Sequence, residues 1–201
     1  MIFLSILNTA ALPWLAAAFL WLFLLVQQAH AGENVVLRES FAGPIDFELA
    51  GNSLRTGTNG CSILASSSDS ISLPNGSSVE KAYLYWAGSG LNADNTVTLN
   101  GSAVSADQVY SETFFYNNQN NYSFGAKADV TGLVSGSGTY TVGGLTFDTQ
   151  TSYCNVGLVF GGWALTVIYN HPGEPNRVVN LFDGFKGFQS SSITLTPNNF
   201  I

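Results

Sequence analysis

Strand-length runs separated by turn residues are the feature that most constrains this chain. After residue 32, apolar residues never keep the three-to-four-residue spacing of a helix over a sustained stretch. They alternate or cluster over short runs, and glycine, proline and asparagine interrupt these runs at intervals of about 8 to 12 residues. This pattern is typical of a β-sandwich or jelly roll. We therefore predict one all-β, antiparallel domain over residues 32–201.

Two hairpins can be placed from their turn residues. The pair Asn100-Gly101, in TVTLNGSAV, suits a type I′ turn because both residues accept positive φ. The pair Gly143-Gly144, in TYTVGGLTF, has the same property. Each pair therefore predicts a hairpin with a two-residue loop.

Two segments, 79–88 and 155–170, carry apolar residues at both odd and even positions. Because these positions face opposite sides of a strand, the pattern indicates central strands covered on both faces. We expect Trp86 and Trp163 to fill the core. Truncating either tryptophan would then cost about 3 to 5 kcal/mol.

The apolar residues change from even-numbered to odd-numbered positions across Gly161-Gly162. This change predicts a β-bulge there, which would keep the apolar side chains on one face of the strand. Residues 177–185 and 191–197 have the composition of further strands. The asparagine-rich stretch 115–125 is interpreted as a polar loop with aromatic ends.

The N-terminus has the pattern of an export signal. Residues 10–26 are apolar, and Ala29 and Ala31 form a small-residue cleavage site before Gly32. We predict that residues 1–31 are a cleaved signal helix and that the product is secreted or on the cell surface. The alternative is an uncleaved membrane anchor, because the segment from Met1 to Val26 is long enough to span a bilayer.

Export gives the two cysteines a meaning. An even number of cysteines in an oxidising compartment predicts a disulfide, here between Cys61 and Cys154. Two buried free thiols are the alternative, and the spacing is not that of a zinc site.

The charge balance excludes several partners. Only 9% of residues are charged and the formal net charge is −7. Without a basic stripe to neutralise phosphates, we expect no nucleic-acid binding, and no membrane contact after signal cleavage. Cell-surface glycans or proteins remain as candidate partners.

Catalytic motifs are not evident. His171, Arg177 and Asp183 lie close in sequence, but His171 sits in a proline-flanked turn, where a histidine is usually a surface residue. There is no G-x-S-x-G elbow and no metalloprotease helix. Asp46 and Glu48 share a strand face, which is one way to place the acids of a glycoside hydrolase, although a solvated strand face is the more usual explanation of such a pair.

Ligand binding is suggested by two other patterns. Tyr83 and Tyr85 share a strand face and offer flat rings to a sugar, although tyrosines are also ordinary strand residues. A carbohydrate-binding, lectin-like module is therefore an alternative function. The oxygen-rich stretches 90–95 and 180–185 would be the calcium ligands if a metal were bound; otherwise no cofactor is expected.

Several phrases together, VEKAYLYWAGSG, TVTLNG, GGWALTVIYNHP and NRVVNLFDGF, resemble the N-terminal exported region of large bacterial surface proteins that carry Ig-like repeat domains. The resemblance spans roughly residues 79–200. It implies a non-catalytic β-rich module with a structural or adhesive role, and it implies no catalytic residues. It also implies that the chain is the first part of a longer repeat protein.

Overall fold

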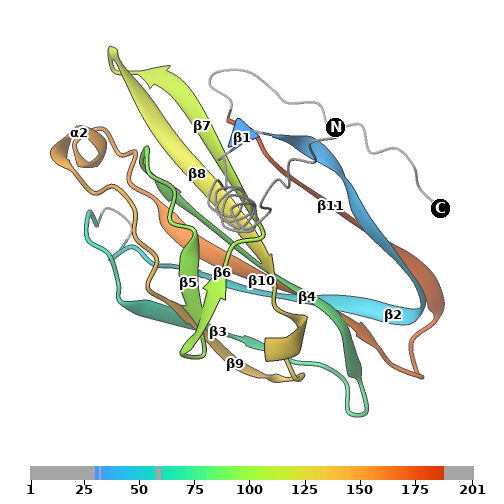
Figure 1. The fold of residues 1–201 in the computed structure, drawn as a ribbon. Helices are drawn as coiled ribbons and strands as arrows, with labels where there is room; N and C mark the ends of the chain where they lie inside the picture. The colour runs from blue at the N-terminus through green and yellow to red at the C-terminus, as the bar shows by residue number, and fades with distance from the viewer. Residues whose placement is uncertain (1–29, 32, 58–59, 188–201) are drawn as a thin grey trace, which may run out of the picture.

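The computed structural model describes residues 30–31, 33–57 and 60–187. Over this part of the chain the protein is a sandwich of two packed, almost wholly antiparallel sheets (Figure 1), which confirms the predicted fold class. Apart from residues 30–31, the predicted signal peptide lies outside the described residues. So do Gly32 at the cleavage site and the strand predicted over residues 191–197.

The large sheet has seven strands, and its neighbours run antiparallel except for the parallel first pair. In spatial order the strands are β1 (His30–Ala31), β7 (Gln108–Tyr116), β8 (Gln119–Asp129), β4 (Ser78–Ser89), β10 (Gly161–Asn170), β2 (Glu33–Ser53) and β11 (Asn176–Phe185).

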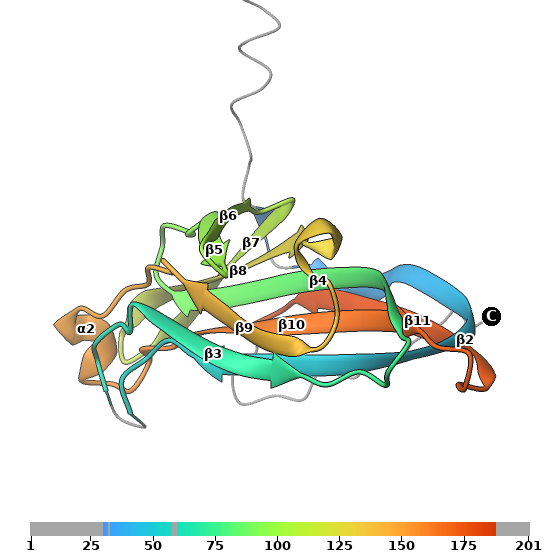
Figure 2. The same cartoon turned by 90° about the horizontal axis from the view of Figure 1, so that it is seen from below.

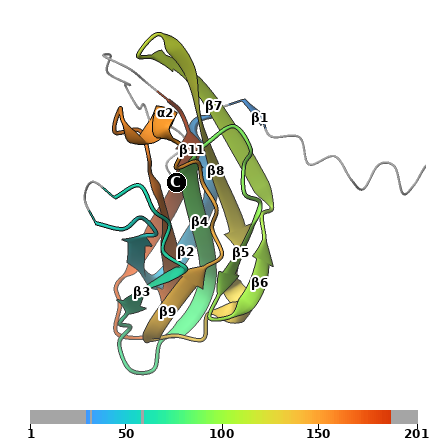
Figure 3. The same ribbon diagram turned by 90° about the vertical axis from the view of Figure 1, so that its left-hand side faces the viewer.

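The small sheet has four strands and covers one face of the large sheet; it faces the viewer in Figure 3. Its spatial order is β3 (Ser66–Ile71), β9 (Gly138–Gly143), β5 (Thr96–Leu99) and β6 (Ser102–Ser105). Two short helical turns complete the described fold, η1 (Thr131–Leu133) and α2 (Thr151–Cys154).

The main core lies between the two sheets, and strict alternation along β4 builds its floor. Ala82, Leu84 and Trp86 are buried on the inner face, whereas the intervening residues are only half-buried. Trp163 is also buried, in the next strand. The Nε1 atoms of Trp86 and Trp163 donate to the Asp94 carbonyl and the Ser67 hydroxyl, so neither buried indole is left without a partner.

A disulfide joins Cys61 to Cys154, as predicted, across a sequence separation of 93 residues. It ties the connection that follows β2 to the short helix α2. Two distant parts of the chain are thereby held at one end of the sandwich.

One of the two predicted hairpins is present in the structure and the other is not. Asn100 and Gly101 have φ values of 51° and 83° and join β5 to β6, as their turn chemistry predicts. The hairpin predicted at Gly143-Gly144 is wrong. Strand β9 ends there, and Leu145 and Phe147 beyond it are buried in the core instead of pairing back.

The bulge predicted at Gly161-Gly162 is also wrong, because β10 begins at Gly161 and pairs regularly with β4 until the register shift between Ile168 and Tyr169. Gly161 serves a different purpose. A Cβ at this position would lie 2.2 Å from the ring of Phe147, so glycine lets that ring pack against the strand.

The predicted loop over residues 115–125 is instead the tip of the β7–β8 hairpin. Asn117 and Asn118 adopt φ values of 51° and 59°, so this pair makes the reversal that asparagine and glycine make elsewhere. Asn121 is fully buried and donates to the carbonyls of Tyr116 and Gln119, which closes the hairpin end.

The longest strand, β2, pairs with two successive strands. Its second half pairs with β10, ending with Ile45 opposite Asn170, and its first half pairs with β11, beginning with Pro44 opposite Asn176. Figure 2 shows β2 bending at one end of the molecule, where the connection between β10 and β11 also turns. Gly43, with φ of 141°, allows the bend.

We call residues 33–44 together with β11 the ribbon, and the face of the large sheet turned away from the small sheet the outer face. Phe41 and Ile45 pack with Ile168 in a second apolar cluster, with Val179 and Leu181 against it. This cluster anchors the ribbon across the outer face. The molecule therefore has a third layer, and the candidate site lies beneath it.

Candidate functional site

Small residues form the floor of a pocket on the outer face. Gly162 of β10 lies opposite Ala87 of β4, and Ala87 lies opposite Gly125 of β8. Three neighbouring strands therefore present almost no side chain at the same level. A shallow trough across the strands is the direct result.

Aromatic rings wall this trough. Tyr85 and Tyr110 rise from the sheet, and Phe185 comes from the end of the ribbon. The rings of Tyr110 and Phe185 stack with centroids 6.2 Å apart and planes 22° apart. A Cβ on Gly125 would lie 2.6 Å from Phe185 Cδ2, so glycine is required for the ring to sit this close.

These residues line an open pocket of about 330 Å³, which we call the ribbon pocket. Its size is at the lower end of the range of ligand-binding pockets, and like them it is mainly apolar with few polar groups. Its lining residues are Tyr85, Trp86, Ala87, Tyr110, Gly125, Ala126, Gly162, Trp163, Ala164, Asp183, Gly184 and Phe185.

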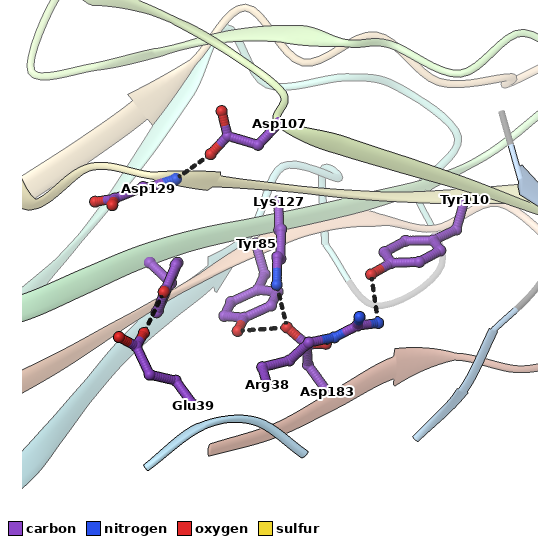
Figure 4. Close-up of polar contacts among 9 residues, drawn as sticks. Arg38, Glu39, Tyr85, Asp107, Tyr110, Lys127, Asp129 and Asp183 are labelled. Atoms are coloured by element: carbon purple, nitrogen blue, oxygen red, sulfur yellow. Dashed lines mark hydrogen bonds and ion pairs between the residues drawn. The ribbon is translucent and has the colours of Figure 1, made fainter. Parts of the chain in front are cut away.

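One carboxylate, Asp183, belongs to the lining of the ribbon pocket, and Figure 4 shows its polar contacts. Its side chain is 9% exposed and accepts from Arg38 Nε, from Lys127 Nζ at 2.7 Å and from the Tyr85 hydroxyl at 3.1 Å. Arg38 also donates from Nη2 to the Tyr110 hydroxyl at 3.2 Å. The ribbon and the sheet are thus joined by paired charges that are mostly removed from water.

A second group of contacts lies beside the first. The Tyr83 hydroxyl donates to Glu39 of the ribbon at 2.6 Å. Lys81 and Lys127 hold their ammonium groups 5.5 and 5.4 Å from the centre of the Tyr83 ring, within cation–π range. Lys81 also pairs with Asp129 at 2.7 Å.

The two tyrosines are held in their neutral form. Burial raises the pKa of Tyr85, and the nearby Asp183 carboxylate raises it further. Burial and the hydrogen bond to Glu39 likewise raise the pKa of Tyr83. Neither phenol can therefore act as a base near neutral pH.

The described residues that line the ribbon pocket include few polar groups. Asp183 is the one acid among the described residues that line the ribbon pocket, and three donors already occupy it. Within the described part of the chain, no serine, cysteine or histidine belongs to that lining. None of the described lining residues therefore supplies the nucleophile and the free general base that hydrolysis needs within hydrogen-bond reach.

The predicted ligand residues divide between two places. Tyr85 forms a wall of the ribbon pocket, and Tyr83 belongs to the contacts beside it. Asp46 pairs instead with Arg177, and Glu48 is exposed further along β2. Neither acid lines the ribbon pocket.

The residues His171, Arg177 and Asp183 are not brought together. The ring of His171 contacts the carbonyl oxygen of Asn75, and Arg177 pairs with Asp46. Asp183 belongs to the separate charge cluster described above. The polar turn after β10 is therefore not an active site built from these three residues.

The two stretches considered for calcium are engaged in other ways. Residues 180–185 lie in strand β11, and Asp94 accepts from the backbone and hydroxyl of Thr146. Among residues 30–31, 33–57 and 60–187, no three histidine, cysteine or acidic side chains come close enough to hold a metal ion.

Sequence reasoning missed Arg38 and Lys127, and it considered Asp183 only as a neighbour of His171 and Arg177 or as a calcium ligand; these three residues join the ribbon to the sheet. A signal for them does exist. Each is a charged residue inside an apolar strand segment, VVLRESF, FGAKADV or NLFDGF, of a chain with few charges. Charges in such positions are seldom buried unless they are paired.

No family model, curated protein or solved structure matches this chain. In the part of the chain that the structure describes, none of the helices combines the length and the apolar character needed to cross a membrane.

Proposed function

We propose that this chain is a non-catalytic module of the cell exterior with a structural or adhesive role, and that it engages its ligand through the ribbon pocket. The observation that carries the proposal is the pocket itself. It combines an apolar floor and aromatic walls with a single acid that is already neutralised by Arg38 and Lys127.

An exported location is supported by the disulfide between Cys61 and Cys154, because such bonds persist in oxidising compartments. The resemblance to the exported regions of bacterial surface proteins points in the same direction. A rigid sandwich closed by a long-range covalent link suits a protein that works outside the cell.

Filling the pocket tests the proposal. Ala164 lines the pocket and is exposed, so Ala164→Phe should occupy the pocket without entering the core. Ala42 is an exposed alanine of the ribbon outside the pocket lining, so Ala42→Phe is the matched control. Cells that produce each variant would be compared for attachment to protein-coated and glycan-coated surfaces.

We expect Ala164→Phe to reduce attachment at least tenfold and Ala42→Phe to leave it unchanged. Protease treatment of intact cells should remove the wild-type chain, as a surface location requires. Equal attachment by both variants, or a chain that intact cells protect from protease, would refute the proposal.

The glycoside hydrolase hypothesis can be tested separately. Asp46→Ala and Glu48→Ala would abolish sugar release if the two acids worked as a catalytic pair. The proposed role predicts no sugar release by the wild-type chain, and hence no difference between it and either variant.

A further inference from the structure

The polar atoms around the ribbon pocket are already engaged with one another, and this restricts the ligand. Asp183 accepts three hydrogen bonds, the Tyr85 hydroxyl donates one of them, and the Tyr110 hydroxyl accepts from Arg38. A sugar ring would bring hydroxyls to a floor of Ala87, glycine and backbone. Each hydroxyl left without a partner there would cost about 1 to 3 kcal/mol.

An apolar group, unlike a sugar hydroxyl, is stabilised when it is buried in this pocket. Gly125, Ala87 and Gly162 leave room above the sheet, and the rings of Tyr110 and Phe185 offer flat apolar walls. Burying one phenylalanine or leucine side chain contributes about 1.5 to 3 kcal/mol. The pocket is therefore suited to a single apolar side chain or a group of that size.

The apolar surface continues beyond the pocket, which points to a ligand larger than a free small molecule. Ala164, which lines the pocket, lies opposite Gly51 of β2. Leu49, two residues along that strand and on the same face, is 59% exposed, and Phe47 after it is 48% exposed. Two residues span about 7 Å of strand, so a polypeptide seated in the pocket would also reach these side chains.

The net charge of the chain indicates whether that polypeptide is basic or acidic. The formal net charge is −7, with six basic residues against 13 acidic ones. Every basic residue already has a partner in the fold: Arg38 and Lys127 pair with Asp183, Lys81 with Asp129, Arg177 with Asp46 and Glu174, and Lys186 with Glu112, while Arg55 donates to the Val159 carbonyl. The surplus charge is acidic, and the exposed Glu48 lies between Phe47 and Leu49 in β2, so a basic partner is favoured over an acidic one.

We propose that the ribbon pocket receives one aromatic or branched aliphatic side chain of a protein partner whose flanking residues are basic. Leu49 and Phe47 provide the neighbouring contact surface. This inference rests on the proposed function, since it names the partner class for the same pocket.

Short peptides provide the probe. The disulfide-bonded chain would be titrated with the acetylated and amidated peptides GKFKG, GKLKG and GKGKG at millimolar concentrations, and its backbone amides followed by NMR. The peptide GEFEG tests the charge preference. Glucose, galactose and N-acetylglucosamine, at the same concentrations, test the carbohydrate alternative.

We expect GKFKG and GKLKG to shift the amide signals of Gly125, Ala87 and Gly162, and GKGKG to leave them in place. Glutamate flanks should weaken the binding of the phenylalanine peptide at least threefold. Ala164→Phe should weaken it at least tenfold and Ala42→Phe should not. If the phenylalanine variant fails to fold, the smaller Ala164→Leu serves the same purpose.

Several results would overturn the inference. Shifts at these amides with sugars but not with peptides would make the ligand a carbohydrate. The absence of shifts with all probes, or peptide binding that Ala164→Phe leaves intact, would also refute it. The proposed function would still stand if Ala164→Phe abolished cell attachment, and it would fail if attachment were unaffected, so the two failures can be told apart.

Discussion

At the scale of single residues, Asp183 is the point where the ribbon and the sheet are joined. Its carboxylate meets Arg38 of β2, Lys127 of β8 and Tyr85 of β4, so three strands other than its own depend on it. Burying charges is costly unless each charge is paired and hydrogen-bonded. The cluster meets this condition because the Asp183 carboxylate pairs with both Arg38 and Lys127.

Removing the Asp183 charge should therefore lower the free energy of unfolding substantially. Asp183→Asn removes the carboxylate charge that Arg38 and Lys127 share inside the fold, and we expect the free energy of unfolding to fall by about 3 kcal/mol. Asp129→Asn breaks a more exposed pair with Lys81 and should cost no more than about 1 kcal/mol. Urea unfolding of both variants measures the difference, and equal losses would contradict this role for Asp183.

The phenols of Tyr83 and Tyr85 provide a prediction at alkaline pH. Their pKa values are raised in the folded state, first by burial and then by neighbouring carboxylates. The folded state therefore favours the neutral phenols, and the stability they add is complete below the unfolded pKa of about 10 and is lost as pH rises above it.

Absorbance at 295 nm should show that these two tyrosines do not ionise near pH 10 while the chain remains folded. Tyr83→Phe and Tyr85→Phe should each leave the native titration curve near pH 10 unchanged and remove one group from the curve in denaturant. A loss of amplitude from the native curve at pH 10 would show that the substituted phenol is exposed.

At the scale of elements, the ribbon and the sandwich differ in how they are stabilised. The sandwich encloses the main core, whereas the ribbon is held by the smaller cluster around Phe41, Ile45 and Ile168, by the packing of the Phe185 ring and by the polar contacts of Asp183 and Glu39. Segments with few buried apolar contacts open at lower free energy than the core.

We therefore expect the amides of β11 to exchange with solvent faster than those of β4 and β10 in the native state. Asp183→Asn should accelerate exchange in β11 by at least tenfold and leave β4 nearly unchanged. Hydrogen exchange followed by NMR resolves these strands. Equal protection of β11 and β4 in the wild-type chain would show that the ribbon is part of the main cooperative unit.

The elements also show what the sequence could and could not predict. The hairpin at Asn100-Gly101 was predictable because turn chemistry is local. The one at Gly143-Gly144 failed because Leu145 and Phe147 gain more from burial between the sheets than from pairing back to β9. The asparagine pair 117–118 was missed because polar composition was interpreted as a loop.

The candidate site was predictable only in part, for a similar reason. Alternation along one strand placed Tyr83 and Tyr85 on a common face. The pocket floor, however, depends on the register that sets Gly162, Ala87 and Gly125 side by side, and no local pattern encodes that register. Folding of the ribbon over that face is likewise a consequence of pairing between residues far apart in the sequence.

At the scale of the whole molecule, the disulfide links segments 93 residues apart. In the chain-entropy model, closing a loop of this length stabilises the folded state by about 4 to 5 kcal/mol. The paired variant Cys61→Ser/Cys154→Ser should lose about that much in urea unfolding. A loss below about 1 kcal/mol would show that strand pairing alone sets the stability of the sandwich.

The central claim is that the ribbon lies across the outer face and closes a pocket there. The close approach of the Phe185 ring to Gly125 tests it most directly, because ring protons that near an α-carbon give nuclear Overhauser effects. We predict strong effects between the Phe185 ring and the Gly125 α-protons, with ring-current shifts of those protons. If these effects are absent and the Gly125 protons have ordinary shifts, the ribbon does not cover this face and the account is wrong.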